Sequence, residues 1–185
     1  INSAGCLTSC TFYGCTDPNA TNYDPNATVD DGSCTYARPS ASVVIIPVSC
    51  FGGSDGSIDL SISGGLAPYS YIWSNGAFTQ DINNLSSGTY TVTVTDALSQ
   101  TQTLSYFVSQ PSILQTTFSV VNTSGPGMTD GAIYTNTTGG TLPYTYYWVS
   151  PYSTTQNLTN ISSGSYTFYA IDANGCYTTN IITVQ

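Results

Sequence analysis

The chain has 185 residues, and charged residues make up only 6% of them, against about 25% in ordinary soluble domains. All ten acidic groups are aspartates, Arg38 is the only basic side chain, there is no histidine, and the net charge is −9. This balance excludes nucleic acids and anionic membrane surfaces as partners, because both are bound through Lys and Arg. It also removes the usual His or Lys base of a nucleophilic enzyme, so we expect no enzyme.

The composition nevertheless predicts a folded protein outside the cytoplasm. Hydrophobic residues reach 40%, which is enough to build a core. No apolar run approaches the roughly 18 residues that span a bilayer, so we expect no membrane insertion. Six cysteines in a chain of this kind favour an oxidising compartment. We therefore expect a secreted protein, extracellular or at the cell surface.

The first segment, residues 1–38, is rich in Cys, Asp, Asn and Gly and predicts a small, loop-rich, disulfide-clamped module. The sequence does not fix the disulfide pairing. Cys15–Cys34 is the preferred bridge, since it closes the acidic loop and would stabilise it by about 3 kcal/mol. Cys6 and Cys10 pair with each other, or one of them pairs with Cys50.

The loop at 14–34, GCTDPNATNYDPNATVDDGSC, contains an internal repetition: the DPNAT that begins at Asp17 recurs at Asp24. Alternating side-chain oxygens in such a loop suit a hard cation with six to eight oxygen ligands. The sequence therefore predicts a Ca²⁺ site, with Asn22 and Thr28 as secondary candidates. The preferred ligands are Asp17, Asn19, Asp24, Asn26, Asp30 and Asp31. The alternative is that these residues only form turns, with their side chains bonded to the nearby backbone.

This loop resembles the calcium-binding repeats of thrombospondin type 3, and similar segments occur in secreted bacterial proteins. It does not resemble an EF-hand, because the glycine at the sixth position and the terminal glutamate are missing. Zinc is disfavoured, since there is no histidine and the cysteines lack paired C-x₂-C spacing.

The rest of the chain is a sequence repeat. DGSIDLSISGGLAPYSYIW (Asp55–Trp73) aligns without a gap on DGAIYTNTTGGTLPYTYYW (Asp130–Trp148), and LSSGTYTVTVTDA (Leu85–Ala97) aligns on ISSGSYTFYAIDA (Ile161–Ala173). Within each copy the apolar period is two, and Gly-rich turns recur at about ten-residue spacing, which is typical of short β-strands. The pattern predicts an all-β fold: two tandem Ig-like Greek-key sandwich domains, at 39–111 and 112–185, after the module.

Both copies resemble the repeat of the very large Bacteroidetes cell-surface adhesins used in gliding motility. Members of that family usually carry one cysteine near the start of the repeat and another in a DANGC-like turn near its end. Here the first copy keeps only Cys50 and the second only Cys176. The resemblance therefore implies that these two cysteines bridge across copies, across chains, or with the N-terminal cysteines.

The aromatic residues shared by the two copies have two readings. Trp73 and Trp148, with Tyr69, Tyr71, Tyr144 and Tyr146, could stack on sugars, but a core role is favoured, because an Ig-like sandwich buries a Trp on a central strand. The apolar stretches 42–48 and 181–184 predict strands. A sharper hypothesis is that one of them completes a sheet in a neighbouring molecule.

Seven Asn-x-Ser/Thr sequons are present. Asn122, Asn136 and Asn157 are the preferred glycosylation sites, and Asn84 and Asn160 are further candidates. The other two, Asn19 and Asn26, lie in the acidic loop, where a glycan and a metal would compete.

These features predict a non-enzymatic extracellular structural protein. It would be a unit of a cell-surface stalk or filament that calcium and disulfides stiffen, either as a head-to-tail homo-oligomer or as tandem repeats of a larger chain. The alternative is an adhesin segment that binds glycans or other surfaces through exposed aromatic residues.

Overall fold

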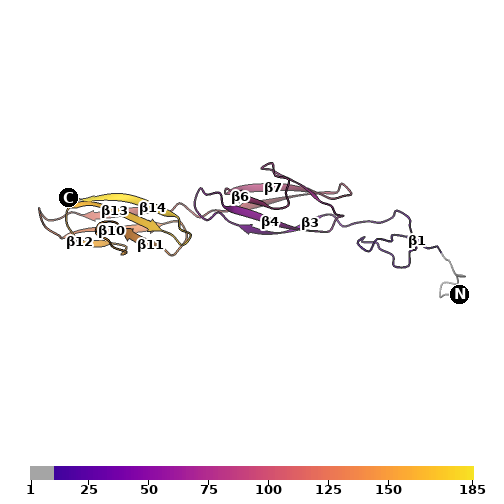
Figure 1. Ribbon diagram of the computed structural model, residues 1–185, viewed down its shortest axis with the longest axis horizontal. Coiled ribbons are helices and arrows are strands. Elements are labelled where there is room, and N and C mark those ends of the chain that lie inside the picture. Colours follow the sequence, from indigo (N-terminus) through magenta and orange to yellow (C-terminus); the bar gives the residue numbers. More distant parts are fainter. Residues whose placement is uncertain (1–10) are drawn as a thin grey trace. The chain divides into compact units, whose positions relative to one another are not determined.

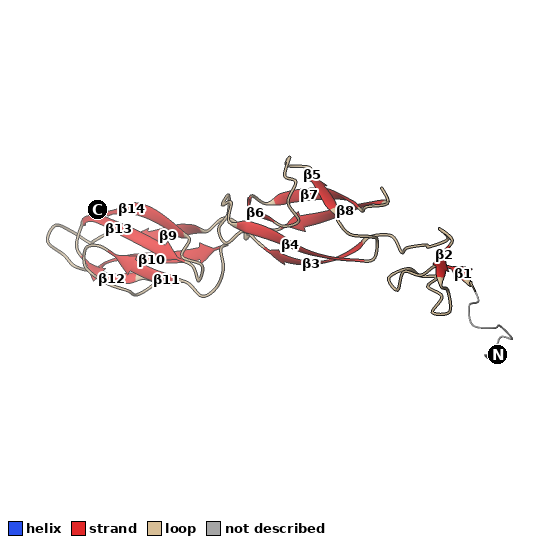
Figure 2. Ribbon diagram, turned by 45° about the vertical axis from the view of Figure 1, so that its right-hand side comes forward, coloured by secondary structure: helices blue, strands red, loops and turns tan. Residues whose placement is uncertain are grey.

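The computed structural model describes residues 11–185, and these residues form β-strands joined by turns and loops, with no helix (Figure 2). The predicted bridge residues Cys6 and Cys10 lie outside the described residues. None of the described residues belongs to a helix of the length and apolarity that crossing a bilayer requires.

The N-terminal module contains little regular structure. Its two short strands, β1 (Tyr13–Gly14) and β2 (Val29–Asp30), pair in parallel. Cys15 and Ala20 are its buried apolar residues. So small a core cannot hold 28 residues together by itself, and the Cys15–Cys34 disulfide adds a covalent link.

The first sequence copy folds as two three-stranded sheets (Figure 1). One sheet has the order β3-β4-β6 and the other β5-β7-β8. The strands are β3 (Ser40–Ile46), β4 (Gly56–Ser63), β5 (Ser70–Trp73), β6 (Ile82–Leu85), β7 (Gly88–Thr95) and β8 (Thr101–Val108).

The second copy repeats this arrangement, with sheets β9-β10-β12 and β11-β13-β14. Its strands are β9 (Gln115–Val121), β10 (Gly131–Thr138), β11 (Thr145–Trp148), β12 (Leu158–Ile161), β13 (Gly164–Ile171) and β14 (Tyr177–Val184). All the strand pairs of this copy are antiparallel.

The strand order confirms the Ig-like Greek-key prediction. An Ig constant-type sandwich places strands A, B, E and D in one sheet and C, F and G in the other. In each copy the first, second and fourth strands share one sheet, and the third, fifth and sixth share the other, which corresponds to A-B-E and C-F-G. Residues 74–81, where a D strand would run in the first copy, contain no strand.

The core of each sandwich follows from the two-residue period. On β7 the side chains of Val92 and Val94 are buried while the intervening threonines are not, as predicted. In the second copy Phe168 lies at the centre of the core, with its ring 4.7 Å from that of Trp148 and 5.3 Å from that of Phe118. The Tyr166 hydroxyl donates to the Ser162 carbonyl at 2.6 Å, which is the tyrosine corner of Ig-like folds.

The described chain divides into two compact units. One comprises the described residues up to Val44 together with Ile58–Ile82 and Thr89–Tyr106. The other comprises Ile45–Ser57, Asn83–Gly88 and Phe107–Gln185. The loop that carries Cys50 therefore belongs to the same compact unit as the whole second copy.

The hypothesis of strand donation is wrong for both apolar stretches. The first stretch is part of β3, which pairs with β4, and the second is part of β14, which pairs with β13 along its whole length. On β14 the side chains of Ile182 and Val184 are buried in the local core, and on β3 alternate side chains are half-buried. Neither is left over for a neighbouring molecule.

Candidate functional site

The acidic loop of the module is built from four carboxylate-centred turns. Asp17 Oδ1 accepts from the backbone N–H of Asn19 at 2.8 Å, and Asp24 Oδ1 accepts from that of Asn26 at 2.9 Å. Asp30 and Asp31 repeat the same two-residue bond with Gly32 and Ser33, at 3.0 and 2.9 Å. The repeated DPNAT motif thus makes a repeated Asx turn, which is the turn chemistry that was the alternative to a metal site.

Two side chains join the ends of this loop. The Tyr36 hydroxyl donates to Asp17 Oδ2 at 2.6 Å, and this bond, with the Asn19 donors, lowers the pKa of Asp17 below its usual value. The same bond raises the pKa of Tyr36. Asn22 donates to the Ser33 carbonyl and accepts from the Thr35 N–H. The structure therefore gives Asn22 a structural role in the loop.

The predicted calcium ligands do not converge in the described chain. Within residues 11–185 no group of three or more Cys or Asp side chains is close enough to hold a metal ion. The backbone N–H and the side-chain amide of Asn26 both donate to Asp24 Oδ1, and neither donates to Asp24 Oδ2. The oxygen-rich side chains and the negative charge suit calcium, but the described positions of the carboxylates do not form a ready site. Calcium binding stays a prediction.

One buried aspartate organises the end of each sandwich. Asp172 Oδ1 accepts from the N–H groups of Asn174 and Cys176, both at 2.9 Å, and Oδ2 accepts from Thr141 N–H at 2.8 Å. These bonds tie the turn between β13 and β14 to the Gly-Gly loop before β11. A Cβ on Gly140 would lie 2.6 Å from Asp172 Oδ2, which explains why glycine occupies that position.

The first copy has the same network around Asp96. Its carboxylate accepts from the N–H groups of Leu66, Leu98 and Gln100 and from the Gln100 side chain. Burial raises the pKa of Asp96, but the hydrogen bonds outweigh this effect, and the pKa lies below its usual value of 3.8. Asp96 and Asp172 occupy the same position of the two aligned copies. The sequence of the turn around each of them does not indicate that its carboxylate is buried.

The turn that Asp172 holds carries a disulfide. Cys176 is bonded to Cys50. Of the pairings that the sequence left open for these two cysteines, the one observed links the two sequence copies. The Asn174 amide also donates to the Ser49 carbonyl at 2.9 Å. All four described cysteines are therefore in disulfides, Cys15–Cys34 and Cys50–Cys176.

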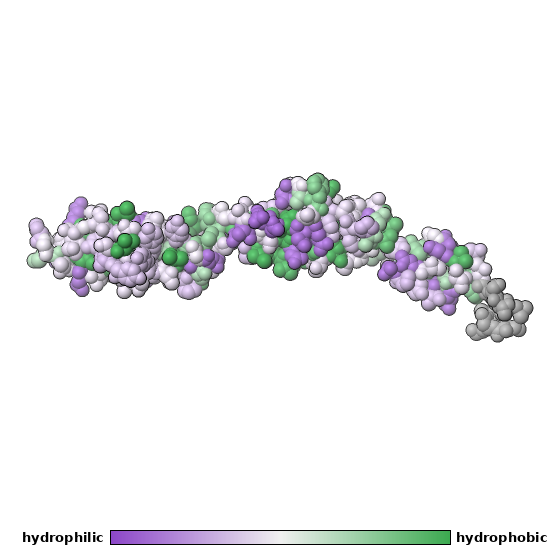
Figure 3. Space-filling view, in the orientation of Figure 1, coloured by the Kyte–Doolittle hydropathy of each residue, from purple (hydrophilic) through white to green (hydrophobic). Residues whose placement is uncertain are grey.

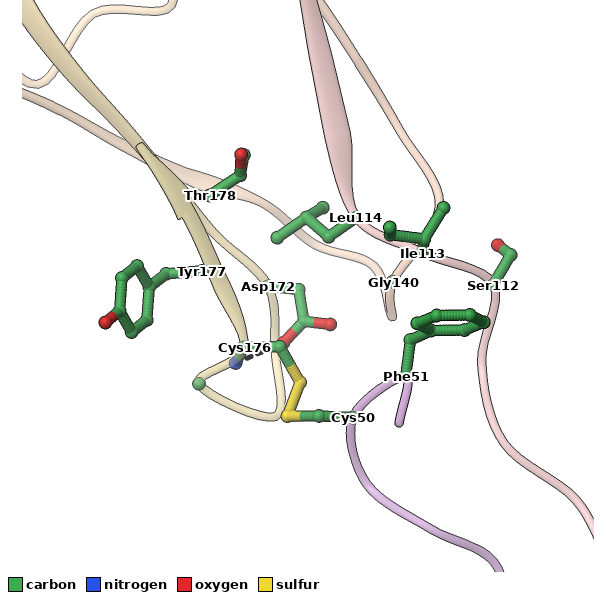
Figure 4. Close-up of a pocket in the computed structure, with 11 residues that line it drawn as sticks. Cys50, Phe51, Ser112, Ile113, Leu114, Gly140, Asp172, Cys176, Tyr177 and Thr178 are labelled. Carbon is green, nitrogen blue, oxygen red and sulfur yellow. Dashed lines mark hydrogen bonds between the residues drawn. A yellow bond between two sulfur atoms is a disulfide. The ribbon is translucent and has the colours of Figure 1, made fainter. Parts of the chain in front are cut away.

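A hollow of about 500 Å³ lies beside the second disulfide (Figure 4). Its walls include Phe51, Ile113, Leu114 and Tyr177, and Asp172 is its one ionisable acid. Both oxygens of that acid are already occupied by backbone N–H donors. The hollow thus offers apolar contact but no group that is free to act as a general base or to hold a cation.

The aromatic residues singled out in the sequence belong mostly to the interior. Trp73 and Trp148 are buried, as predicted, and their indole N–H groups donate to the carbonyls of Thr79 and Thr155. Tyr71 is also buried, and Tyr146 packs against the core of the second copy. Tyr69 and Tyr144 donate to the carbonyls of Gly64 and Gly139, so they brace the Gly-Gly loops.

Other tyrosines of the second copy, which the sequence did not single out, are exposed. Tyr152 and Tyr177 are exposed by 75% and 67%, and Tyr147 and Tyr169 are half-buried beside them. Their rings contact one another across the outer face of the sheet β11-β13-β14. The signal was available, because Tyr147 and Tyr169 occupy outward positions in strands of period two.

The predicted glycosylation sites are all exposed. Asn122 accepts from the Gln185 N–H and Asn157 accepts from the Thr135 N–H, in both cases through Oδ1. Asn84 and Asn160 occupy matching positions of the two copies, at φ of 55° and 58°. Asn136 lies on β10. Their exposure is compatible with a glycan, and glycosylation stays a prediction.

Comparison with known proteins links part of the chain to one family. The model of the SprB repeat family matches residues 42–78, which include β4 and β5 of the first copy. Two curated relatives are the chloroplastic ribulose bisphosphate carboxylase/oxygenase activase 1 of Larrea tridentata and the corresponding activase of Spinacia oleracea. Each is 78% identical over 23 residues, 12% of this chain. The chain spans only 5% of the length of either activase.

Several solved structures of Ig domains are similar to this chain. The eight N-terminal Ig domains of Down Syndrome Cell Adhesion Molecule isoform 1.30.30 match 82% of this chain and 25% of that one, with 13% identity and a TM-score of 0.42. The two Ig domains of DIP-gamma match 80% of this chain and 97% of that one, with 11% identity and a TM-score of 0.41.

We predict that acid weakens the first sandwich partly through Asp96. Because its folded-state pKa is depressed, its contribution to stability is complete above the unfolded value of 3.8 and is lost as the pH falls through the folded pKa. The Asp96→Asn variant should therefore lose less of its urea midpoint between pH 7 and pH 2 than the parent. The Trp73 indole N–H signal in NMR reports this repeat separately from Trp148. An identical loss in parent and variant would contradict the assignment, and exposed Asp59→Asn is the control.

We also predict that the module depends on its disulfide. The Cys15→Ser, Cys34→Ser double variant releases a loop of sequence separation 19 and should lose about 3 kcal/mol, more than so small a core can replace. Chymotrypsin should then cleave rapidly at Phe12, Tyr23 and Tyr36. The Cys50→Ser, Cys176→Ser variant is the control and should keep these sites protected. Equal protection in both variants would show that the loop folds without its bridge.

Proposed function

We propose that this chain is a non-enzymatic, extracellular structural segment that carries tension in a cell-surface stalk or filament. The two described disulfides support an oxidising location. The SprB repeat match at residues 42–78 supports an adhesin-type repeat protein at the cell surface. The low content of charged residues, 6%, fits this interpretation. Figure 3 shows residues of intermediate hydropathy over much of the face in view.

The observation that carries the proposal is the covalent path through Cys50–Cys176. This bond closes a loop of sequence separation 126, and the loop contains every strand from β4 to β13. Tension applied outside the two cysteines passes from Cys50 to Cys176 through the disulfide. It can detach the edge strands β3 and β14, but it cannot extend the residues between the cysteines. Nearly all of both sandwiches is therefore shielded from the load.

The hydrogen bonds at the bridge support this role. The carboxylate of Asp172 fixes the backbone N–H of Cys176, and the Asn174 side chain bonds to Ser49 beside Cys50. Both ends of the disulfide are thus held by polar contacts in one compact unit. A disulfide that closed only a flexible loop would not need the hydrogen bonds from Asn174 to Ser49 and from Cys176 to Asp172.

Single-molecule force spectroscopy tests the load path. When the oxidised chain is pulled through its two ends, we expect only the short extension of residues outside the bridge. The Cys50→Ser, Cys176→Ser variant should show further unfolding events that add roughly 400 Å of contour length, since an extended chain gains about 3.3–3.6 Å per residue. The Cys15→Ser, Cys34→Ser variant is the matched control and should add only the short loop of the module. Full-length unfolding of the oxidised parent would refute the proposal.

We further propose that calcium stiffens the module and that the units assemble head to tail. Four aspartates lie within residues 17–31, and Arg38 is the only cation of the whole chain, so their repulsion favours a bound cation. Because the described carboxylates do not converge, binding would have to draw on amide, backbone and water oxygens and move the loop.

Electron microscopy of the oxidised chain tests this second proposal. We expect filaments with calcium that shorten or fray after chelation, because the joints lose their bound cation. The Asp24→Asn, Asp31→Asn variant should form short filaments even with calcium, and Asp59→Asn should behave like the parent. Monomers that chelation leaves unchanged would contradict both assembly and the metal site, while leaving the load path of the disulfide untouched.

A further inference from the structure

The outer face of the sheet β11-β13-β14 carries a continuous row of four tyrosine rings, which we call the tyrosine row: Tyr152, Tyr147, Tyr169 and Tyr177. The ring centroids of successive members are 5.1, 6.2 and 6.5 Å apart. Tyr147 and Tyr169 lie directly opposite each other in the β11–β13 register, and Tyr177 begins β14. The row therefore crosses all three strands of the sheet.

The first copy shows that the fold does not require these rings. Aligned on the repeat, Ile72, Thr93 and Thr101 occupy the positions of Tyr147, Tyr169 and Tyr177. Ile72 and Thr93 are opposite each other in the same register. The same sandwich thus forms with small or aliphatic side chains on this face. The tyrosines are specific to the second copy, although they expose costly aromatic area to water.

We propose that the tyrosine row is a binding site for a single chain of a neutral, soluble polysaccharide. A pyranose ring presents C–H groups on its faces and hydroxyls around its rim. Tyrosine matches this combination, since it offers an aromatic face to the C–H groups and a hydroxyl to the rim. The outward residues around the row, among them Thr167, Thr179 and Thr183, add further hydroxyl groups.

Charge selects a neutral ligand. Strands β11, β13 and β14 contain no charged residue, and the nearby carboxylate of Asp172 is buried and already accepts three N–H donors. The net charge of −9 repels acidic polysaccharides. These strands carry no cationic side chain that could pair with a phosphate or a carboxylate group.

The shape of the row selects a flexible single chain rather than a protein or a crystalline surface. The rings form a single line, and Thr167 separates the exposed side chains of Val149 and Ile181 beside it, whereas a stable protein partner covers about 800 Å² with a contiguous apolar core. Its rings are also not coplanar: from Tyr152 to Tyr177, successive rings are inclined to each other by 82°, 52° and 44°. A twisted ribbon of sugars can follow such tilts, but the flat face of a crystal cannot.

Affinity electrophoresis of the full chain tests the proposal. The native gels contain hydroxyethylcellulose, xyloglucan, laminarin or dextran, and the expected result is retardation of the parent by at least one of them. Alginate, an acidic polysaccharide, should cause none. Replacing one ring, as in Tyr169→Thr, should weaken binding about three- to tenfold. The triple variant Tyr147→Ile, Tyr169→Thr, Tyr177→Thr, which restores the residues of the first copy, should abolish it.

The control is Tyr134→Thr, since Tyr134 is an exposed tyrosine on β10, in the other sheet of the same copy. An unchanged Trp148 indole signal checks that each variant is folded. The proposal is overturned if no neutral polysaccharide retards the parent or if the triple variant is retarded equally. It is also overturned if the parent binds microcrystalline cellulose only. A parent that is not retarded and dimerises, with a triple variant that is monomeric, would instead make this face a protein interface.

Discussion

The buried carboxylate at the end of the fifth strand of each sandwich is the interaction on which the remaining features depend. In the second copy Asp172 accepts three backbone N–H groups and so fixes both the Gly-Gly loop and the turn that leads into β14. That turn places Cys176 for its bond to Cys50 and Tyr177 at the end of the tyrosine row. A neutral side chain there could not accept all three donors, and each unpaired buried N–H would carry a desolvation cost.

The two copies show how one scaffold takes on different roles at its surface. In the first copy Gln100 stands where the second has Cys176, and its side chain donates to Asp96 at 3.1 Å. At the start of the second copy Gly125 stands where the first has Cys50, while the neighbouring serine still donates its N–H to the following aspartate. The buried positions and the carboxylate networks stay the same. The changes fall at turns and outward strand positions, where the fold tolerates them.

The sequence was sufficient for the fold because its signals were local. Period-two alternation in 88–96, the Gly-Gly pairs and a Trp in each copy predict strands, turns and a core, and the observed strand order confirms an Ig-like Greek key. The same signals could not show which strands or which cysteines pair with each other. The apolar run 42–48 predicts a strand but does not show that this strand pairs with β4, and the prediction of strand donation was therefore wrong. The Cys50–Cys176 bond likewise depends on two turns that are far apart in the sequence.

The candidate sites also differ in how far the sequence alone could predict them. The sequence singles out Asp17, Asp24 and their neighbours by residue type. Asp and Asn occur both in metal sites and in Asx turns, so the sequence alone does not distinguish the two. The structure shows that each carboxylate closes its own turn. The tyrosine row depends on register, because Tyr147 meets Tyr169 only if β11 and β13 pair as they do. Comparing the copies with each other separates these cases. A feature present in both copies, such as the Asp96 and Asp172 network, is required by the sandwich. The tyrosines and the unshared cysteines occur in one copy only, so the sandwich does not require them.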